Sequence, residues 1–339
     1  MGKEISHILM ADQTARSLAD PGRDPLASTL CDFSPAFHFG SIAADTFFYG
    51  IKVPFLEKKH DCCGDMIHGF DGNDTSLPIL RMLRDLKNSR DDRLFRVKLA
   101  FVCGFLTHVA LDAVCHPCIY YFSGNYHHEN IGERIRAVTR HRLMESWLDL
   151  FVLRKASLSI DSFPFMDTIR GNPRLNLALL RFFFNAFEQT ANIDGYLWKY
   201  LRRGYSVQML LNSMFPNAFW GKMVGAMNRA LKGKLNTFMA LFYPWEYREI
   251  PPEVFNYEYY RHPVTGEEFP GDFNELWDNA LLRSLEFLEA VRGYIYGDGN
   301  PDRLGGVIKG YSLSMGLVGV PVSSAGYFDI MPLHRIWAY

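Results

Sequence analysis

Two segments of the chain carry histidine and carboxylate side chains at a spacing that suits a metal site. His108, Asp112 and His116 recur at every fourth position. At ~100° per residue an α-helix places them on one face, within about 80° of one another. His141 and Glu145 repeat this spacing on a second segment. Facing helices of a bundle bring such donors together around an ion, so the pattern predicts a divalent metal site between two helices.

The first of these segments lies within the longest apolar stretch of the chain, residues 99–122. Its length would suffice to cross a bilayer, but His108, Asp112 and His116 are costly to bury in lipid. A helix in the protein core is the better interpretation, and the sequence predicts no transmembrane segment. Because an unpaired charge is costly in such a core, a bound metal also explains why these residues lie there.

Further potential donors lie upstream. Asp45 ends the apolar segment 40–45, His68 ends the segment 64–68, and His7 lies in the first helical segment. Simpler interpretations are a helix-capping aspartate, a loop histidine and a half-buried core histidine. Periodicity alone favours those simpler interpretations.

The order, spacing and residue types of these donors resemble the zinc-dependent phospholipase C family, which is related in fold to the S1/P1-type nucleases. The resemblance covers about the first 150 residues, and its most specific parts are the His108–Asp112 and His141–Glu145 pairs. It implies an all-helical fold that binds up to three zinc ions in a cleft and hydrolyses phosphodiesters.

The resemblance also implies a role for each donor. The implied ligands are Asp45, His68, His108 and Asp112 for one zinc ion, His116, His141 and Glu145 for a second, and His7 with Asp112 as a bridge for a third. Asp45 would also be the catalytic general base for the attacking water. The expected cofactor is two to three zinc ions, and iron, manganese or nickel would also suit such donors.

Two alternatives concern the ligands themselves. His127 or His128 could take the place of His116, because the secreted phospholipases have a longer gap after the aspartate. We prefer His116, which lies on the donor face of its helix. In the secreted enzymes an amino-terminal Trp completes the third metal site, whereas here other residues precede His7, so the filling of that site stays open.

Two alternatives concern the class of protein. His60 and Asp61 form the dipeptide of an HD-type phosphohydrolase, which would add His38 and Asp112 as further ligands. A non-catalytic metal-binding protein is the other alternative. Structural zinc sites are usually closed, four-coordinate and rich in cysteine, whereas the donors here are more numerous and are histidines and carboxylates, which favours catalysis.

Helical periodicity dominates the elements that must position these residues. The predicted helices cover residues 5–18, 77–87, 94–115, 134–155, 173–187, 196–211, 216–231 and 273–296. Pro117 predicts that the third of these ends near His116, and residues 242–272 are predicted to form a long ordered loop. The fold class is therefore all-α, an irregular multi-helix bundle, and the resemblance implies that this bundle is of the phospholipase C/P1 nuclease type. We expect a single domain over 1–339, with a metal-site half at about 1–156 and a substrate-shaping half at about 157–339.

Composition narrows the function further. Of 339 residues, 48% are hydrophobic and 22% are charged, which excludes a disordered or fibrous chain. Lys and Arg total 36 against 37 Asp and Glu, so the net charge of -1 gives no nucleic-acid signature, although it leaves room for a local basic patch. No signal peptide is visible, which predicts a cytoplasmic protein.

These observations predict a metal-dependent hydrolase that cleaves phosphodiesters by metal-activated water, in the manner of phospholipase C. The expected substrate is a phospholipid or another small phosphodiester.

Overall fold

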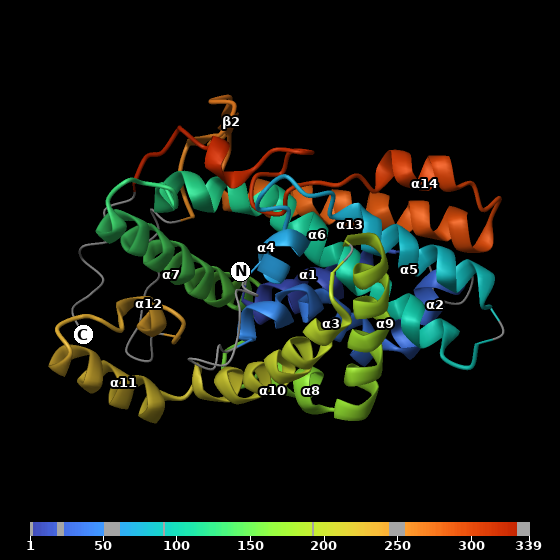
Figure 1. Ribbon diagram of the computed structural model, residues 1–339, viewed down its shortest axis with the longest axis horizontal. Helices are drawn as coiled ribbons and strands as arrows, with labels where there is room; N and C mark the ends of the chain where they lie inside the picture. Colours follow the sequence, from blue (N-terminus) through green and yellow to red (C-terminus); the bar gives the residue numbers. More distant parts are fainter. Residues whose placement is uncertain are drawn as a thin grey trace.

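The computed structural model describes residues 3–18, 24–50, 62–90, 92–191, 193–243 and 255–330 (Figure 1). These residues form an all-α, multi-helix fold with one small two-stranded sheet, as the periodicity predicted. The α-helices are α1 (Glu4–Ser17), α2 (Pro25–Asp32), α3 (Ser34–Ala43), α4 (Cys62–Ile67), α5 (Ser76–Asn88), α6 (Phe95–Ser123), α7 (Ile131–Lys155), α8 (Phe165–Arg170), α9 (Pro173–Ala191), α10 (Trp198–Met214), α11 (Ala218–Ala230), α12 (Asn236–Met239), α13 (Phe273–Tyr296) and α14 (Pro301–Val307). Short 3₁₀ helices are η1 (Ala44–Tyr49), η2 (Gly195–Leu197) and η4 (Val322–Ser324).

Helix α6 runs through the middle of the molecule and packs against α3, α13, α1 and α7 (Figure 1). It is long and apolar enough to cross a membrane, but 89% of its most apolar window is buried inside the protein. Such burial is typical of a core helix, and it leaves the side chains of α6 facing other helices on nearly all sides.

The approach of α3 to α6 requires two glycines. A Cβ atom on Gly104 would lie 1.9 Å from the carbonyl oxygen of Phe37, and one on Gly40 would lie 2.0 Å from that of Phe101. The two backbones therefore touch where a side chain would separate them. Because α3 leads directly into η1, this contact also fixes Asp45, in the first turn of η1, against α6.

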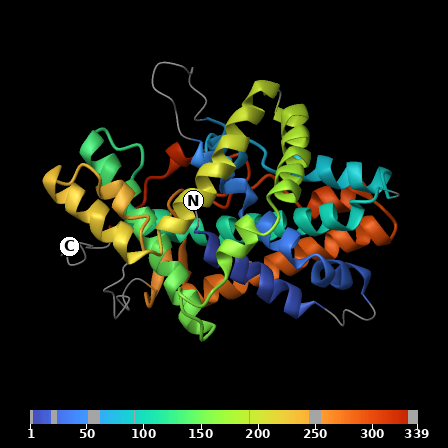
Figure 2. The ribbon, with the colours of Figure 1, turned by 90° about the horizontal axis from the view of Figure 1, so that it is seen from below.

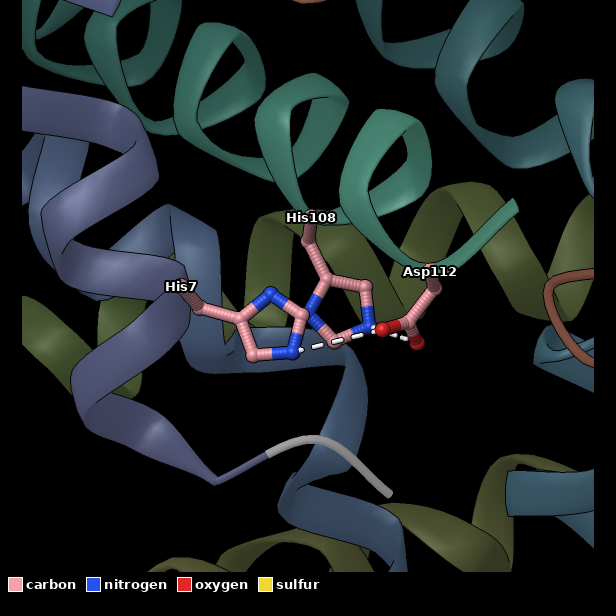
Figure 3. A group of neighbouring side chains, drawn as sticks. All are labelled: His7, His108 and Asp112. Atoms are coloured by element: carbon pink, nitrogen blue, oxygen red, sulfur yellow. Dashed lines mark ion pairs between the residues drawn. The ribbon is translucent and has the colours of Figure 1, made fainter. Parts of the chain in front are cut away.

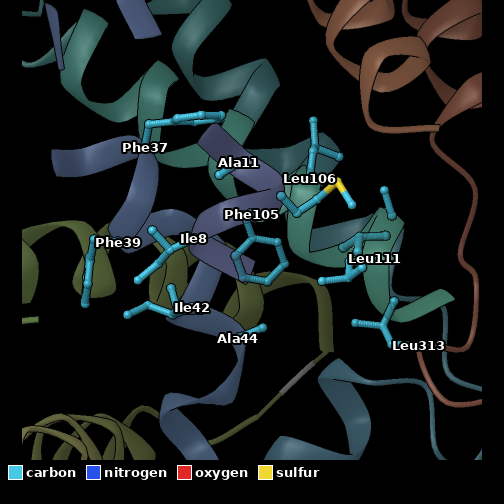
Figure 4. Packing of buried hydrophobic residues seen from close by; sticks show 14 of the residues in the cluster. Ile8, Ala11, Phe37, Phe39, Ile42, Ala44, Phe105, Leu106, Leu111 and Leu313 are labelled. Carbon is cyan, nitrogen blue, oxygen red and sulfur yellow. The ribbon is translucent and has the colours of Figure 1, made fainter. Parts of the chain in front are cut away.

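Apolar side chains of α1, α3 and α6 fill the space around this contact (Figure 4). Ile8, Phe37, Phe39 and Phe105 are each almost completely buried. Full burial of such a side chain stabilises the fold by ~1.5–3 kcal/mol, so this core holds the helices that carry the polar site.

Helix α6 does not end near His116, contrary to the sequence-based expectation, but continues to Ser123. Pro117 has no N–H group to bond the carbonyl of Ala113. Gly316, from the carboxy-terminal region, packs there instead, and a Cβ atom on it would lie 2.3 Å from that carbonyl oxygen. The break in the hydrogen-bond ladder is thus covered rather than exposed.

The predicted loop over residues 242–272, of which 242–243 and 255–272 are described, contains a β-hairpin. Strands β1 (Tyr259–Arg261) and β2 (Glu268–Pro270) pair in antiparallel fashion, with Tyr260 opposite Phe269. Three residues a strand are too few for an alternating pattern to be recognised in the sequence.

Candidate metal centre

All eight predicted donors are buried and lie in three neighbouring groups. Within each group, one nitrogen or oxygen atom per residue lies within 4.8 Å of the others. The groups are His7, His108 and Asp112; Asp45, His68 and His108; and His116, His141 and Glu145. Shared membership of His108 joins the first two groups into one cluster.

Elements far apart in the sequence bring these side chains together. Helix α6 presents His108, Asp112 and His116 on three successive turns, as the spacing predicted. Helix α1 contributes His7, and Figure 3 shows its ring beside His108, with Asp112 facing both imidazoles. The rings of His7 and His108 are stacked, with 4.0 Å between their centroids. The remaining donors come from η1, from the residue after α4, and from α7.

Asp112 lies at the centre of the arrangement. Its Oδ1 is 3.4 Å from Nε2 of His7 and 3.6 Å from Nε2 of His116. Its Oδ2 is 3.1 Å from Nε2 of His108 and 3.8 Å from Nε2 of His68. One carboxylate thus faces four imidazoles, which is the position a bridging ligand requires.

Asp45 faces the same region from η1. Its Oδ1 is 3.2 Å from Nε2 of His68. Burial alone would raise the pKa of this carboxyl, but His108 and His68 outweigh it and hold the pKa below the ordinary value. Asp45 is therefore ionised at neutral pH and can act as a ligand or as a base.

The third group lies between α6 and α7. Oε1 of Glu145 is 3.1 Å from Nε2 of His141 and 3.3 Å from Nε2 of His116. The rings of Tyr120 and Tyr126 pack on His141, at centroid distances of 4.8 and 5.5 Å. Burial lowers the pKa of His141 to about 4, so this imidazole is neutral, as a metal ligand must be.

Backbone carbonyls orient three of the imidazoles. Each donates its Nδ1–H to a carbonyl oxygen, which directs Nε2 into the cluster. The pairs are His68 with Gly64 at 2.8 Å, His108 with Ser41 at 2.9 Å, and His116 with Leu313 at 2.7 Å. Sequence reasoning missed all three acceptors, because a backbone oxygen leaves no trace in residue type.

Several donor atoms lack other partners. The Nε2 atoms of His7, His68 and His108 and Oδ2 of Asp112 are buried, and among the described residues their polar neighbours are the other donors of the cluster. Leaving a polar atom in this condition costs roughly 1–3 kcal/mol. Imidazole nitrogens and carboxylate oxygens are the ligands that zinc takes in catalytic sites, so the donor set fits this ion.

The charges of the cluster point the same way. Burial by itself lowers the pKa of His108, but the carboxylates of Asp112 and Asp45 outweigh it and raise the pKa to about 9. Burial and the neighbouring His108 lower the pKa of His7 to about 3. The two buried carboxylates are therefore stabilised by a positive charge beside them. A bound divalent cation can supply this charge, as a proton on His108 does.

The structure separates His116 from its two competitors. His127 and His128 are exposed, and Nδ1 of His128 accepts a hydrogen bond from the backbone N–H of Asn130 at 3.0 Å. His116 is buried beside His141. Only His116 of these three lies in a donor group.

The residues of the HD alternative are not brought together in the described part of the chain. His60 and Asp61 lie outside the described residues. His38 pairs with Asp12, with 2.6 Å between Nε2 and Oδ1, while Asp112 lies in the cluster described above.

Comparison with known protein families identifies the class of protein. Residues 6–207 match the family model described as zinc dependent phospholipase C, which is more than half of the chain. The chain belongs to the zinc-dependent phospholipase C family. It is therefore a hydrolytic enzyme, of the metal-dependent phospholipase type. The match contains all eight donors and extends past α9 into α10. Searches of the curated proteins and of the solved structures returned no match.

Proposed function

We propose that this member of the family hydrolyses the phosphodiester bond of a phospholipid or of another small phosphodiester, with two to three zinc ions. The observation that carries the proposal is the sharing of donors. Asp112 faces four imidazoles and His108 belongs to two groups, so adjacent ions would lie close to one another. Neighbouring metal ions are the arrangement that phosphodiester hydrolysis uses.

The first and third proposed ions share Asp112, and the other ligands each belong to one ion. The proposed ligands are Asp45, His68, His108 and Asp112 for the first ion, His116, His141 and Glu145 for the second, and His7 with Asp112 for the third. When bound, zinc lowers the pKa of water and neutralises the developing charge on the phosphate. The third ion has the fewest side-chain ligands, His7 and the shared Asp112. The proposal of two to three ions leaves its presence open.

Asp45 is the proposed general base. Its carboxyl is ionised, and neither oxygen has a hydrogen-bond partner among the described residues beyond the 3.2 Å ion pair with His68. Either oxygen can therefore accept a proton from an attacking water. This assignment requires a productive distance of about 3 Å between the carboxylate and that water.

A structural metal site is the competing proposal. Such sites are closed and rich in cysteine. Among the described residues, none of the three donor groups contains a cysteine, and Cys115 and Cys118 are buried outside them. The eight donors exceed what one tetrahedral ion needs, which supports open coordination and catalysis.

The test measures metal content and turnover together. We expect purified protein to contain at least two divalent ions a chain and to hydrolyse bis-p-nitrophenyl phosphate in a metal-dependent way. His108→Ala and Glu145→Ala remove ligands of different proposed ions. Each variant should lose about one ion and nearly all turnover. Catalytic zinc sites have few protein ligands, so removal of one ligand weakens the binding of its ion.

The matched control is His127→Ala, which removes an exposed histidine outside the donor groups. It should keep the metal content and the turnover of the wild type. Unchanged metal content in both ligand variants would contradict the assignment. Metal without any turnover on phosphodiesters would support the structural alternative.

A further inference from the structure

The region around α10, α11 and α12 has an unusual charge. Residues 195–243 contain no Asp or Glu, whereas the rest of the chain holds all 37 Asp and Glu against 29 of the 36 Lys and Arg. The basic residues of this region are Lys199, Arg202, Arg203, Lys222, Arg229, Lys232 and Lys234. The near-neutral net charge of the whole protein thus hides a basic segment.

Helix α11 presents an apolar stripe to the outside. Phe219, Met223, Met227 and Leu231 recur at every fourth position and lie on one face. Their exposed fractions are 67%, 38%, 50% and 44%. Three of them lie on α11 and Leu231 directly follows its last residue, so large exposed apolar side chains gather on one side of this helix, as they do at interaction sites.

The opposite face of α11 is already used for packing. Gly221, Val224 and Gly225 are buried, and a Cβ atom on Gly225 would lie 3.7 Å from Cε of Met239 in α12. The outward stripe is therefore separate from the face of α11 that packs in the protein. It is a second apolar face, and its side chains remain exposed beside the other described residues.

The stripe continues into a cavity at its amino-terminal end. Phe219 lines a space of about 840 Å³ together with Leu153, Leu158 and Phe163. None of the eight proposed metal ligands lines this cavity. Arg154 and Asp161 also line this space, so it is of mixed polarity, and it is distinct from the metal centre.

Helix α11 lies at one end of the molecule in both views (Figures 1 and 2). Its neighbour α12 joins it to α7, the helix that carries His141 and Glu145. The hydroxyls of Thr139 and Thr237 are 2.8 Å apart, and the Ser146 hydroxyl donates to the carbonyl of Ala240 at 2.7 Å. A partner that binds α11 would therefore lie near α7, the helix that carries two of the proposed metal ligands.

The combination of charges and apolar side chains selects the partner. Lys222, Arg229, Lys232 and Lys234 are exposed on α11 and on the turn after it. A helix that lies on a membrane buries an apolar face below the headgroups and places Lys and Arg at their level. A nucleic acid would meet the same cations but would leave the apolar stripe in water.

We propose that the outward face of α11 docks the protein on a phospholipid bilayer that contains anionic headgroups. The apolar stripe enters the headgroup region, and the basic residues contact the headgroups. This extends the proposed function, because a phospholipid substrate lies in such a surface. Vesicle binding can be measured without hydrolysis, so the two proposals fail separately.

The first measurement uses the full chain and sedimenting vesicles. We expect stronger binding to phosphatidylcholine vesicles that contain phosphatidylserine than to phosphatidylcholine alone. The difference should shrink as salt is raised, because ions screen the headgroup charge. Equal binding to both vesicle types, or no binding to either, would overturn the proposal.

Variants then test the stripe. The double variant Met223→Glu/Met227→Glu should lose vesicle binding by at least about tenfold, since each glutamate removes apolar burial and adds repulsion. The matched control is Leu282→Glu on α13, where a leucine with 64% exposure lies outside this region. It should bind vesicles as the wild type does. If the double variant does not fold, the single variant Met227→Gln should still weaken binding severalfold.

The basic residues are tested by Lys232→Gln/Lys234→Gln. Each cation near an anionic membrane contributes ~1 kcal/mol, so binding should fall roughly 30-fold for the pair. Bis-p-nitrophenyl phosphate is soluble and needs no membrane. Its turnover should therefore stay unchanged in both Met223→Glu/Met227→Glu and Lys232→Gln/Lys234→Gln. Vesicle binding that is unaffected by the glutamates would overturn the proposal.

Two other occupants would give distinct results. If a second copy of the chain covers the stripe, the wild type is a dimer and Met223→Glu/Met227→Glu is a monomer. If the region binds nucleic acid, a single-stranded oligonucleotide binds the wild type, and only the lysine variant weakens this binding. Either result, without vesicle binding, overturns the membrane assignment.

Discussion

Asp112 connects more of the metal centre than any other single side chain of the described residues. Burial alone would raise the pKa of its carboxyl, but His116, His108 and His7 hold the pKa well below the usual range. The carboxylate therefore stays charged in a buried place, which is stable only with positive charge around it. The proposed bridging role between metal ions would supply that charge at both oxygens.

The role of Asp45 can be separated from that of a simple ligand. Asp45→Asn keeps the shape and one donor oxygen but removes the charge and the basicity. If Asp45 is the general base, most of the metal should remain while turnover falls by roughly 10²–10⁴-fold, the usual contribution of such a group. Metal analysis and bis-p-nitrophenyl phosphate hydrolysis on the same preparation measure both quantities.

Asp12→Asn is the control for this substitution. Asp12 also pairs with a histidine, His38, at 2.6 Å, but this pair is partly exposed and lies outside the donor groups. The control should keep both metal and turnover. Full turnover with full metal in Asp45→Asn would show that Asp45 is neither base nor essential ligand.

At the scale of residues, helical spacing predicted which side chains share a face but not what holds them. The positions His108, Asp112 and His116 follow from 3.6 residues per turn. The carbonyl of Leu313, which orients His116, comes from the other end of the chain. A backbone acceptor of that kind carries no residue signature, and only the folded structure reveals it.

The contact between α3 and α6 is the most demanding in the fold, and Gly104→Ala tests it. The added Cβ would lie 1.9 Å from the carbonyl oxygen of Phe37, so the helices must move apart. We expect the free energy of unfolding to fall by roughly 1–3 kcal/mol, as overpacking does elsewhere. Metal affinity should also weaken, because the Ser41 carbonyl that orients His108 moves with α3.

Gly293→Ala on α13 is the matched control, because no atom lies within 4 Å of its added Cβ. Alanine there should raise the free energy of unfolding by up to ~1 kcal/mol through helix propensity. Urea unfolding measures both variants. Equal stability changes of the same sign would mean that the α3–α6 contact is not as tight as described.

The segment after α14 makes a similar contact with α6, which Gly316→Ala tests. Gly316 has a φ of 69° and approaches the Ala113 carbonyl, whereas Gly319 has a φ of 71° and nothing within 4 Å of an added Cβ. Both substitutions incur the left-handed backbone cost of ~1–2 kcal/mol. Only Gly316→Ala adds a steric clash, so it should be the more destabilising by roughly 1–3 kcal/mol in urea unfolding.

The same comparison has a second readout. Displacement of this segment also moves the Leu313 carbonyl, so Gly316→Ala should lower metal content while Gly319→Ala leaves it unchanged. Identical behaviour of the two variants would show that backbone strain alone matters at these positions.

At the scale of elements, length decided what could be predicted. Long periodic segments such as α7 and α13 were recognised, and the start of α13 agrees to the residue. Helices α2 and α3 are only 8 and 10 residues long, and neither was predicted. Short apolar segments give too few turns for a period to emerge. The continuation of α6 through Pro117 was missed because its compensation, Gly316, is a tertiary contact.

At the scale of the molecule, the donor cluster gathers side chains from parts of the chain that are far apart in sequence. Its side chains come from α1, η1, the end of α4, α6 and α7, and its orienting carbonyls include one from the carboxy-terminal region. The family match ends at residue 207, and the structure reaches beyond it to complete the site. The division into a metal-site half and a substrate-shaping half stays a prediction. Leu313 belongs to the second of these halves, yet its carbonyl accepts the hydrogen bond of His116 in the first.

Removal of metal should therefore destabilise the whole molecule rather than one loop. An ion held at 1,000 times its dissociation constant stabilises the folded state by ~4 kcal/mol, because the unfolded chain has no preformed site. Treatment with a chelator should lower the Tm by many degrees, and added zinc should restore it. His108→Ala, which removes a donor from two groups, should show a smaller shift on chelation than the wild type. An unchanged Tm after complete loss of metal would mean that the buried carboxylates and imidazoles satisfy one another. The charge argument for the metal centre would then be wrong, even if the bound ions prove necessary for catalysis.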